Sequence, residues 1–320
     1  YTVNKDSKKG PAWSNSLFED NAEFGYGMLL AQQAIRDGLK AKVEEVAANE
    51  NATAEVKAAC QEWLDTFSVG ATNGVATDKL VAALENIDCP TCKDIVNNKD
   101  FLAKKSQWIF GGDGWAYDIG FNGVDHVLAS GKDINIMVFN TEVYSNTGGQ
   151  SSKATPTGAV AQFAAGGKEV KQKDLAAIAM SYGYVYVAQI SMGADMNQTI
   201  KAIAEAEAYP GPSLIIAYAP CINHGIKKGM AKAQTEEKLA VQSGYWNLFR
   251  FNPAAEGKKF SLDCKPATVD YQEFIKGEVR YTSLALKNPA RAEKLFAKAE
   301  QNAKDKYAYL EKLVTLYDEK

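Results

Sequence analysis

The sequence WIFGGDGW at residues 108–115 decides the fold class of this chain. Its apolar part, residues 108–110, leads into a glycine-rich turn that carries the carboxylate of Asp113. A second apolar run, residues 134–139, leads into NTEVYSNTGGQ at residues 140–150, and a helix-length segment separates the two runs. Such a strand–helix–strand unit places polar side chains at the carboxyl ends of both strands, which is the edge where parallel α/β sheets bind ligands.

The same alternation continues further along the chain. Residues 174–182 and 197–208 have helical patterns, and the apolar runs 184–190 and 213–218 are typical of buried strands. Strands that alternate with helices in this way predict an α/β fold with a doubly wound, mostly parallel sheet.

The flanking segments predict helical extensions at both ends. Residues 24–64 read as helices, residues 65–106 as a less regular polar insert, and residues 289–320 as one long amphipathic helix. We therefore expect one domain over residues 1–250, with a variable insert at about 65–106, and a C-terminal extension over residues 251–320.

Composition excludes several classes of protein. The chain has 320 residues with 46% hydrophobic and 23% charged side chains, a net charge of −3 and no basic patch, which argues against nucleic-acid binding. It has no run of 18 apolar residues, so we expect no membrane span. Five cysteines, an odd number, argue for a reducing compartment. Because the first residue is Tyr1, we expect a piece of a larger polypeptide or a processed product.

Three oxygen donors follow the two strands at a regular spacing. Asp113 and Thr141 are 28 positions apart (141 − 113), and the carbonyl of Val143 lies two residues further on. Together they can form half of an octahedron, the arrangement that Mg²⁺ takes with diphosphate oxygens and water. Asn140 is an alternative ligand, since strand alternation lets only one of the neighbours Asn140 and Thr141 point at the metal.

The longer sequence around these positions is more specific. Residues 112–120, GDGWAYDIG, together with residues 140–150 resemble the thiamine-binding C-terminal domain of the pyruvate:ferredoxin (flavodoxin) oxidoreductases. The resemblance continues through SSKATP at 151–156 and YAPCINHG at 218–225, and it begins near GPAWSNSLFED at 10–20. It covers most of the chain.

The resemblance implies a set of site residues. It favours Thr141 over Asn140 as the second Mg²⁺ ligand. It also places Asn146, the catalytic candidate, close to thiamine diphosphate, where its amide can touch the diphosphate or the reacting carbon. Cys221 would be one thiolate of a [4Fe–4S] cluster, whose other three ligands would lie outside this chain. The residues expected to contact the cofactors are Gly112, Asp113, Gly114, Trp115, Asn146, Thr147 and Cys221.

The implied activity is the oxidative decarboxylation of pyruvate with coenzyme A to acetyl-CoA and CO₂, with electrons passing to ferredoxin or flavodoxin. The resemblance also implies a cytoplasmic homodimer, or an enzyme of a hydrogenosome or mitochondrion in a eukaryote. The glutamate that activates thiamine would come from another domain, so we expect this chain alone to be inactive. Two alternatives stay open: the same domain in a pyruvate:NADP oxidoreductase fusion, or a non-catalytic structural module.

Other reactive residues have simpler readings. We expect the pair Cys89 and Cys92, in CPTC, to be incidental or locally structural, because no strand precedes it and no second pair accompanies it. His126 is expected on a helix surface or in a satisfied core position, and His224 beside Cys221 could orient the cluster or its backbone. The polar loop 141–173 either covers the diphosphate or is a surface loop.

Overall fold

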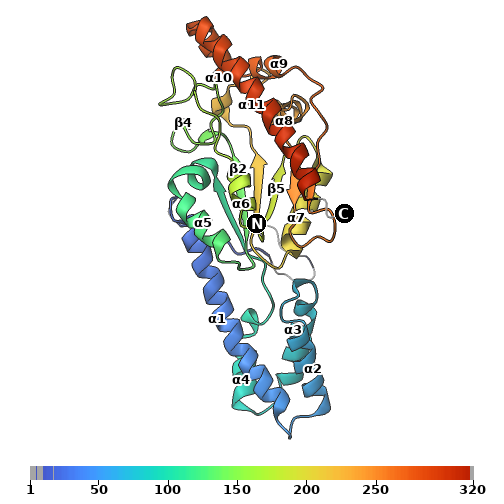
Figure 1. Cartoon of the computed structure of the whole chain (residues 1–320). Coiled ribbons are helices and arrows are strands. Elements are labelled where there is room, and N and C mark those ends of the chain that lie inside the picture. Colours follow the sequence, from blue (N-terminus) through green and yellow to red (C-terminus); the bar gives the residue numbers. More distant parts are fainter. Residues whose placement is uncertain (1–4, 6–9, 17, 318–320) are drawn as a thin grey trace. The chain divides into compact units, whose positions relative to one another are not determined.

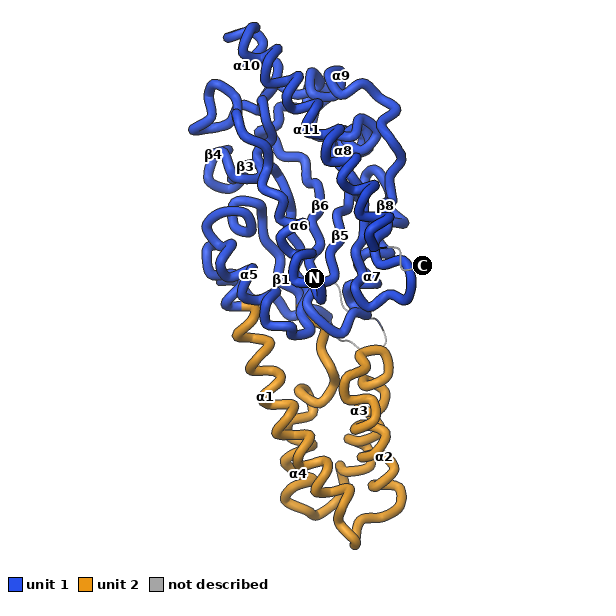
Figure 2. The backbone as a smooth tube through the Cα atoms, viewed as in Figure 1, with its two compact units in different colours: residues 1–24, 108–320 blue, residues 25–107 orange. Residues whose placement is uncertain are grey.

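The computed structural model describes residues 5, 10–16 and 18–317. The chain divides into two compact units, which Figure 2 shows in different colours. The larger unit comprises residues 1–24 and 108–320, and the smaller unit comprises residues 25–107.

A six-stranded sheet forms the centre of the larger unit, with the strand order β1-β2-β6-β5-β7-β8 (Figure 1). The first four strands in this order are parallel to one another. Strand β7 pairs antiparallel with β5, and β8 pairs antiparallel with β7. The predicted α/β fold with a mostly parallel sheet is therefore confirmed. The strands are β1 (Trp108–Gly112), β2 (Asn135–Asn140), β5 (Tyr186–Ile190), β6 (Ser213–Tyr218), β7 (Phe249–Phe251) and β8 (Phe260–Leu262).

The order of the strands explains the double winding. The chain runs from β1 to β2 and on to β5, and then reverses direction along the sheet to place β6 between β2 and β5. A right-handed crossover at this reversal puts α7 (Met196–Ala208) on the opposite face of the sheet from α5 (Phe121–Ala129). In α7, Ala202 and Ala206 pack on the face that carries Met137, Ala188 and Ile215.

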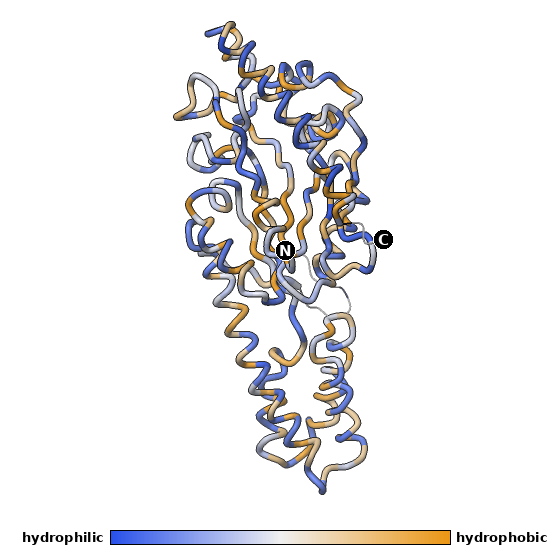
Figure 3. The backbone as a smooth tube through the Cα atoms, viewed as in Figure 1, coloured by the Kyte–Doolittle hydropathy of each residue, from blue (hydrophilic) through white to orange (hydrophobic). Residues whose placement is uncertain are grey.

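The strand register aligns the carboxyl ends of the parallel strands. Gly112 of β1 pairs with Phe139 of β2, and the next residue, Asn140, pairs with Tyr218 of β6. The residues that follow these three strands therefore gather at one edge of the sheet, as the sequence predicted. Figure 3 shows the hydrophobic residues concentrated in the strands of this sheet.

Helices and two short strands complete the larger unit. The remaining elements are η2 (Gly114–Ile119), β3 (Val143–Tyr144), β4 (Gln150–Ser151), α6 (Leu175–Met180), η3 (Ile222–His224), η4 (Met230–Lys232), α8 (Ala233–Gln242), α9 (Tyr271–Lys276), α10 (Val279–Lys287) and α11 (Pro289–Leu316). The predicted long C-terminal helix is confirmed as α11, which the side chain of Asn288 caps and Pro289 begins. Asp174 caps α6 by accepting the amide of Ala177.

The expected boundary between domains at residue 250 does not coincide with a boundary between the two observed units. The boundary at residue 250 falls inside the larger unit, because β7 and β8 extend the sheet and α11 packs against β8. The segment 25–107 is instead the part that packs separately. The sequence pattern missed this because β7 and β8 are short and no longer alternate with helices.

The smaller unit consists of helices joined by short loops, so residues 65–106, which we expected to be less regular, are mostly helical. Its elements are most of α1 (Asn21–Ala48), α2 (Ala54–Asp65), α3 (Gly70–Leu84), α4 (Pro90–Asn97) and η1 (Lys99–Phe101). Trp63 and Leu80 lie in its core with Ile95 and Leu102, all fully buried. Burial of these side chains stabilises the helices. The apolar pattern was not recognised in the sequence because many exposed polar residues lie between the buried ones.

Candidate functional site

Three oxygen atoms converge where β1 and β2 end. The Oγ1 atom of Thr141 lies 2.8 Å from Oδ1 of Asp113 and 3.0 Å from the carbonyl oxygen of Val143. The amide of Thr141 also donates to Oδ1 of Asp113 at 3.1 Å, and Ser152 donates to Oδ2 at 2.5 Å. Carboxylate, hydroxyl and carbonyl oxygens at this spacing form a set of hard ligands of the kind that Mg²⁺ takes.

Asp113 is fully buried at this convergence. Burial raises the pKa of its carboxyl to about 6, and the hydrogen bonds from Ser152 and Thr141 oppose that rise. The groups that donate to it, the amide and hydroxyl of Thr141 and the hydroxyl of Ser152, are all uncharged. A cation beside this carboxylate would favour its ionised form.

The structure separates the two neighbours that the sequence left as alternatives. The side chain of Thr141 faces Asp113, whereas Oδ1 of Asn140 accepts the amide of Glu142 at 3.0 Å. Asn140 is thus engaged in the turn that follows β2. Which of the two binds a metal stays a prediction, but the geometry favours Thr141. No group of three or more His, Cys, Asp or Glu side chains in the described part of the chain could hold a metal, so a metal here depends on mixed oxygen donors.

Glycines make room for aromatic rings beside Asp113. A Cβ atom on Gly111 would lie 2.2 Å from the ring of Trp115, and one on Gly114 would lie 2.5 Å from the ring of Tyr144. Trp115 is fully buried, and its indole Nε1 has no hydrogen-bond partner. The predicted cofactor contacts of Trp115 and of the adjacent Gly112 and Gly114 stay predictions.

Asn146 and Thr147 lie on an exposed turn between β3 and β4. The turn is closed by the amide of Gly149, which donates to the carbonyl of Tyr144 at 2.8 Å, and Thr147 donates to Gln150 at 2.6 Å. The side chain of Asn146 is free of the core, so it is available to a ligand at this edge. The catalytic role of Asn146 stays a prediction.

Cys221 follows β6 at the same edge of the sheet. Its Sγ accepts the amide and the side-chain nitrogen of Asn223, each at 3.5 Å, and it is a free thiol. His126 lies exposed on α5, which confirms the helix-surface reading. His224 is fully buried and contacts the carbonyl of Thr141, a contact that the sequence did not indicate.

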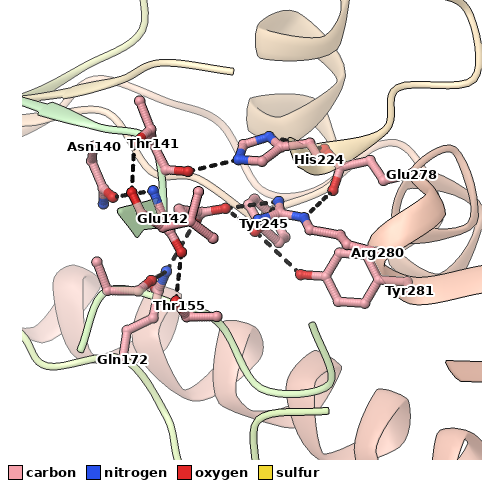
Figure 4. A network of polar contacts seen from close by, with 12 residues as sticks. Asn140, Thr141, Glu142, Thr155, Gln172, His224, Tyr245, Glu278, Arg280 and Tyr281 are labelled. Carbon is pink, nitrogen blue, oxygen red and sulfur yellow. Dashed lines mark hydrogen bonds and ion pairs between the residues drawn. The ribbon is translucent and has the colours of Figure 1, made fainter. Parts of the chain in front are cut away.

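A buried network of charges borders the oxygen cluster, and sequence reasoning missed it (Figure 4). The carboxylate of Glu142 lies 2.7 Å from Nη2 of Arg280, and Nε of Arg280 lies 2.7 Å from Oε2 of Glu278. All three side chains are buried. Arg280 is 138 positions after Glu142 (280 − 142), and no motif surrounds either residue, so the sequence contained no signal for this contact.

The network holds one cation between two carboxyl groups. Burial raises the pKa of Glu278 to about 7, while Arg280 opposes that rise, so Glu278 holds a proton below neutral pH.

The Nε2 atom of His224 lies 2.7 Å from the carbonyl oxygen of Thr141. Since a carbonyl only accepts, Nε2 carries the hydrogen. Burial lowers the pKa of His224 well below its ordinary value, so the ring is neutral and Nδ1 is an acceptor.

Comparison with known proteins identifies the family. Residues 99–217 match the family described as "Thiamine pyrophosphate enzyme, C-terminal TPP binding domain", which includes Asp113 and Thr141. The chain is 54% identical, over 98% of its length, to a pyruvate:ferredoxin oxidoreductase of Moorella thermoacetica. It is 52% identical, over 98% of its length, to a pyruvate-flavodoxin oxidoreductase of Klebsiella pneumoniae. The chain belongs to the pyruvate:ferredoxin (flavodoxin) oxidoreductase family.

Relatives of the NADP-linked kind also occur. A mitochondrial pyruvate dehydrogenase [NADP(+)] of Euglena gracilis is 46% identical over 94% of the chain. The chain spans only 27% of the length of the Moorella and Klebsiella oxidoreductases and 17% of the Euglena protein. The predicted thiamine diphosphate domain of this oxidoreductase family is thus confirmed.

Among the residues that the structure describes, no helix is both long and apolar enough to cross a lipid bilayer.

Proposed function

We propose that this chain supplies the thiamine diphosphate and Mg²⁺ site of an enzyme that oxidatively decarboxylates pyruvate. Coenzyme A would take the acetyl group, and electrons would pass through [4Fe–4S] clusters to ferredoxin or flavodoxin. One observation carries the proposal: the oxygens of Asp113, Thr141 and Val143 converge at the carboxyl edge of the sheet, inside the matched thiamine domain.

The residues of this chain have distinct roles in the proposed site. Asp113, the hydroxyl of Thr141 and the carbonyl of Val143 would hold Mg²⁺, which would supply positive charge for the diphosphate of the cofactor. Bound thiamine diphosphate supplies the electron sink for decarboxylation. The exposed Asn146 lies in the loop after Val143, so its amide is available to the cofactor or the reacting carbon.

Further parts of the enzyme complete this site in our proposal. Cys221, at the same sheet edge, would provide one thiolate to a [4Fe–4S] cluster, which would supply the electron acceptor. The other three thiolates, the glutamate that activates thiamine, and the groups that bind pyruvate and coenzyme A come from other domains or a second subunit of a homodimer. The compartment we propose is the cytoplasm, or a mitochondrion or hydrogenosome in a eukaryote.

A second candidate function keeps the same site and changes the electron acceptor. The similarity to the Euglena protein favours an NADP-linked fusion as the alternative. A non-catalytic module is less favoured, because such a module has no need for three converging oxygens, one of which belongs to the buried carboxylate of Asp113.

The metal site is tested with Asp113→Ala in the full-length enzyme. Mg²⁺-dependent binding of thiamine diphosphate, measured by calorimetry, should be lost, because Asp113 is the only carboxylate of the set. Asp125→Ala is the matched control, since Asp125 lies on α5 and bonds to Tyr182 at 2.8 Å, away from the oxygen cluster. Unchanged cofactor affinity in the Asp113 variant would refute the assignment.

A further inference from the structure

Glu142 lies between two proposed metal ligands in an unusual backbone conformation. Its φ is 61°, and among the described residues Phe163 is the only other non-glycine residue with a positive φ. The left-handed conformation costs an L-residue about 1–2 kcal/mol. It therefore persists only where the surrounding structure holds it.

Hydrogen bonds hold Glu142 on both sides of its backbone. Its amide donates to Oδ1 of Asn140 at 3.0 Å, and its carbonyl accepts from Thr155 at 2.5 Å. Its side chain is fully buried, and the carboxylate has three donors. These are Nη2 of Arg280 at 2.7 Å, the hydroxyl of Tyr245 at 2.6 Å and Nε2 of Gln172 at 3.1 Å.

Among these donors, Arg280 is the one that carries charge. It reaches Glu142 from α10, and its own guanidinium is held by Glu278 and by the hydroxyl of Tyr245 at 3.0 Å. Figure 4 shows this guanidinium between the two carboxyl groups. Without Arg280, the carboxylate of Glu142 would be buried with no cation beside it, which is strongly unfavourable.

We propose that Arg280 is a positioning residue for the metal site. By pairing with Glu142, Arg280 fixes the left-handed turn between Thr141 and Val143. That turn directs the carbonyl of Thr141 to His224 and leaves the hydroxyl of Thr141 in contact with both Asp113 and the carbonyl of Val143. The inference rests on the proposed function, because it concerns the ligands of the proposed Mg²⁺.

The geometry explains why a distant residue matters for the ligands. A change of φ at Glu142 rotates the peptide group that Glu142 shares with Thr141. This rotation changes the position of the Thr141 oxygen relative to the Val143 oxygen. Mg²⁺ demands near-ideal octahedral geometry, so a small displacement of either oxygen weakens binding. Residues that orient metal ligands in this way typically contribute about 10- to 100-fold to metal affinity.

The test is the affinity of the full-length enzyme for Mg²⁺ at saturating thiamine diphosphate, measured by calorimetry. Arg280→Met should weaken Mg²⁺ binding by about 10- to 100-fold. Arg280→Lys should weaken it less, because an ammonium group keeps the charge but cannot contact both carboxyl groups as the planar guanidinium does. The lysine variant also serves if the methionine variant does not fold.

A matched control and a rescue separate positioning from general stability. Arg250→Met removes a part-buried arginine that pairs with Glu205 and Asp263, so it should lower stability without changing Mg²⁺ affinity. Adding Glu142→Gly to Arg280→Met should restore most of the affinity, because glycine adopts a positive φ without strain and leaves no carboxylate behind.

Three results would overturn the inference. Equal Mg²⁺ affinity in the wild-type and Arg280 variants would refute it alone and leave the proposed function intact. Equal weakening in the Arg250 variant would assign the effect to stability. If the wild-type enzyme bound thiamine diphosphate without any dependence on Mg²⁺, the proposed metal site itself would be wrong, and Arg280 would have no ligands to position.

Discussion

The Nδ1 atom of His224 lies 3.7 Å from Oε1 of Glu278, and both atoms are buried without a hydrogen-bond partner. Because Nδ1 is an acceptor, the two atoms are compatible only if Oε1 carries a proton. A small movement would then close a hydrogen bond from Glu278 to His224. His224 would connect Glu278 to the carbonyl of Thr141.

This relationship predicts how stability depends on pH. Burial raises the pKa of Glu278 from its ordinary value of 4.5 to about 7 in the folded protein. The stability that the protonated form contributes is therefore fully present below pH 4.5 and is lost as the pH rises through 7. Glu278→Gln should lack this loss, because an amide stays neutral, donates to His224 and accepts from Arg280.

Amide hydrogen exchange of α10 in the full-length enzyme provides the measurement. Relative to the wild type at each pH, the Glu278→Gln variant should show similar protection at pH 5 and greater protection at pH 8. The difference should not exceed about 3 kcal/mol, the free energy that corresponds to the rise of the Glu278 pKa from 4.5 to about 7. A difference that stays constant between pH 5 and pH 8 would mean that Glu278 is ionised throughout this range.

Two glycines beside Trp115 should tolerate no side chain. A Cβ atom on Gly111 would lie 2.2 Å from the indole, and one on Gly120 would lie 2.1 Å from it. Since Trp115 is fully buried, neither ring nor backbone can yield easily, and each alanine variant should lose about 1–3 kcal/mol. Near-ultraviolet circular dichroism should show an altered tryptophan environment.

Gly38→Ala is the corresponding control for helix α1. A Cβ atom at Gly38 would meet nothing within 4 Å, so alanine should stabilise the helix by about 0.5–1 kcal/mol. Thermal unfolding of the three variants gives the comparison. A Gly111 or Gly120 variant as stable as Gly38→Ala would show that Trp115 can be repositioned.

The cysteines of the smaller unit should differ in reactivity. Cys89 caps α4, and the amide of Cys92 donates to its sulfur at 3.5 Å, which lowers the pKa of Cys89. Burial raises the pKa of Cys60 and of Cys92 to about 11. Because the thiolate is the nucleophile, iodoacetamide at pH 8 should alkylate Cys89 well before the other two. Mass spectrometry of timed samples tests this order, and equal rates for Cys89 and Cys92 would contradict it.

The sequence predicted the elements whose signals are local. The strand–helix–strand unit around Asp113, the strand that ends before Cys221 and the helix after Asn288 are each specified by short apolar patterns, glycine turns or capping residues. These signals also placed Asp113 and Thr141 at one sheet edge, because the carboxyl ends of parallel strands lie at the same edge of a sheet.

The rest depends on contacts between distant residues. Arg280 meets Glu142 only through the packing of α10, and nothing in either local sequence indicates the pair. Helix α3 contains Gly70, Gly74 and several β-branched or polar residues, which have low helix propensity. It forms because Leu80 and Leu84 are buried with Trp63, and tertiary packing overrides propensity there.

The final prediction concerns Cys221 and the transfer of electrons. Cys221 follows β6 at the sheet edge where Asp113 and Thr141 meet, and its sulfur accepts hydrogen bonds from the amide and the side chain of Asn223. In the proposed enzyme it ligates a [4Fe–4S] cluster, which needs four thiolates.

Cys221→Ser in the full-length enzyme should therefore lower the iron content and the electron paramagnetic resonance signal of the reduced clusters. Electron transfer to ferredoxin should be strongly impaired, while decarboxylation of pyruvate should persist in part, because a hydroxyl is a poorer iron ligand than a thiolate but the oxygen cluster at Asp113 is untouched. Cys264→Ser is the matched control: its sulfur accepts the amide of Leu248 at 3.3 Å, and it should change neither iron content nor electron transfer. A Cys221 variant with full iron content and normal ferredoxin reduction would make Cys221 a packing residue only.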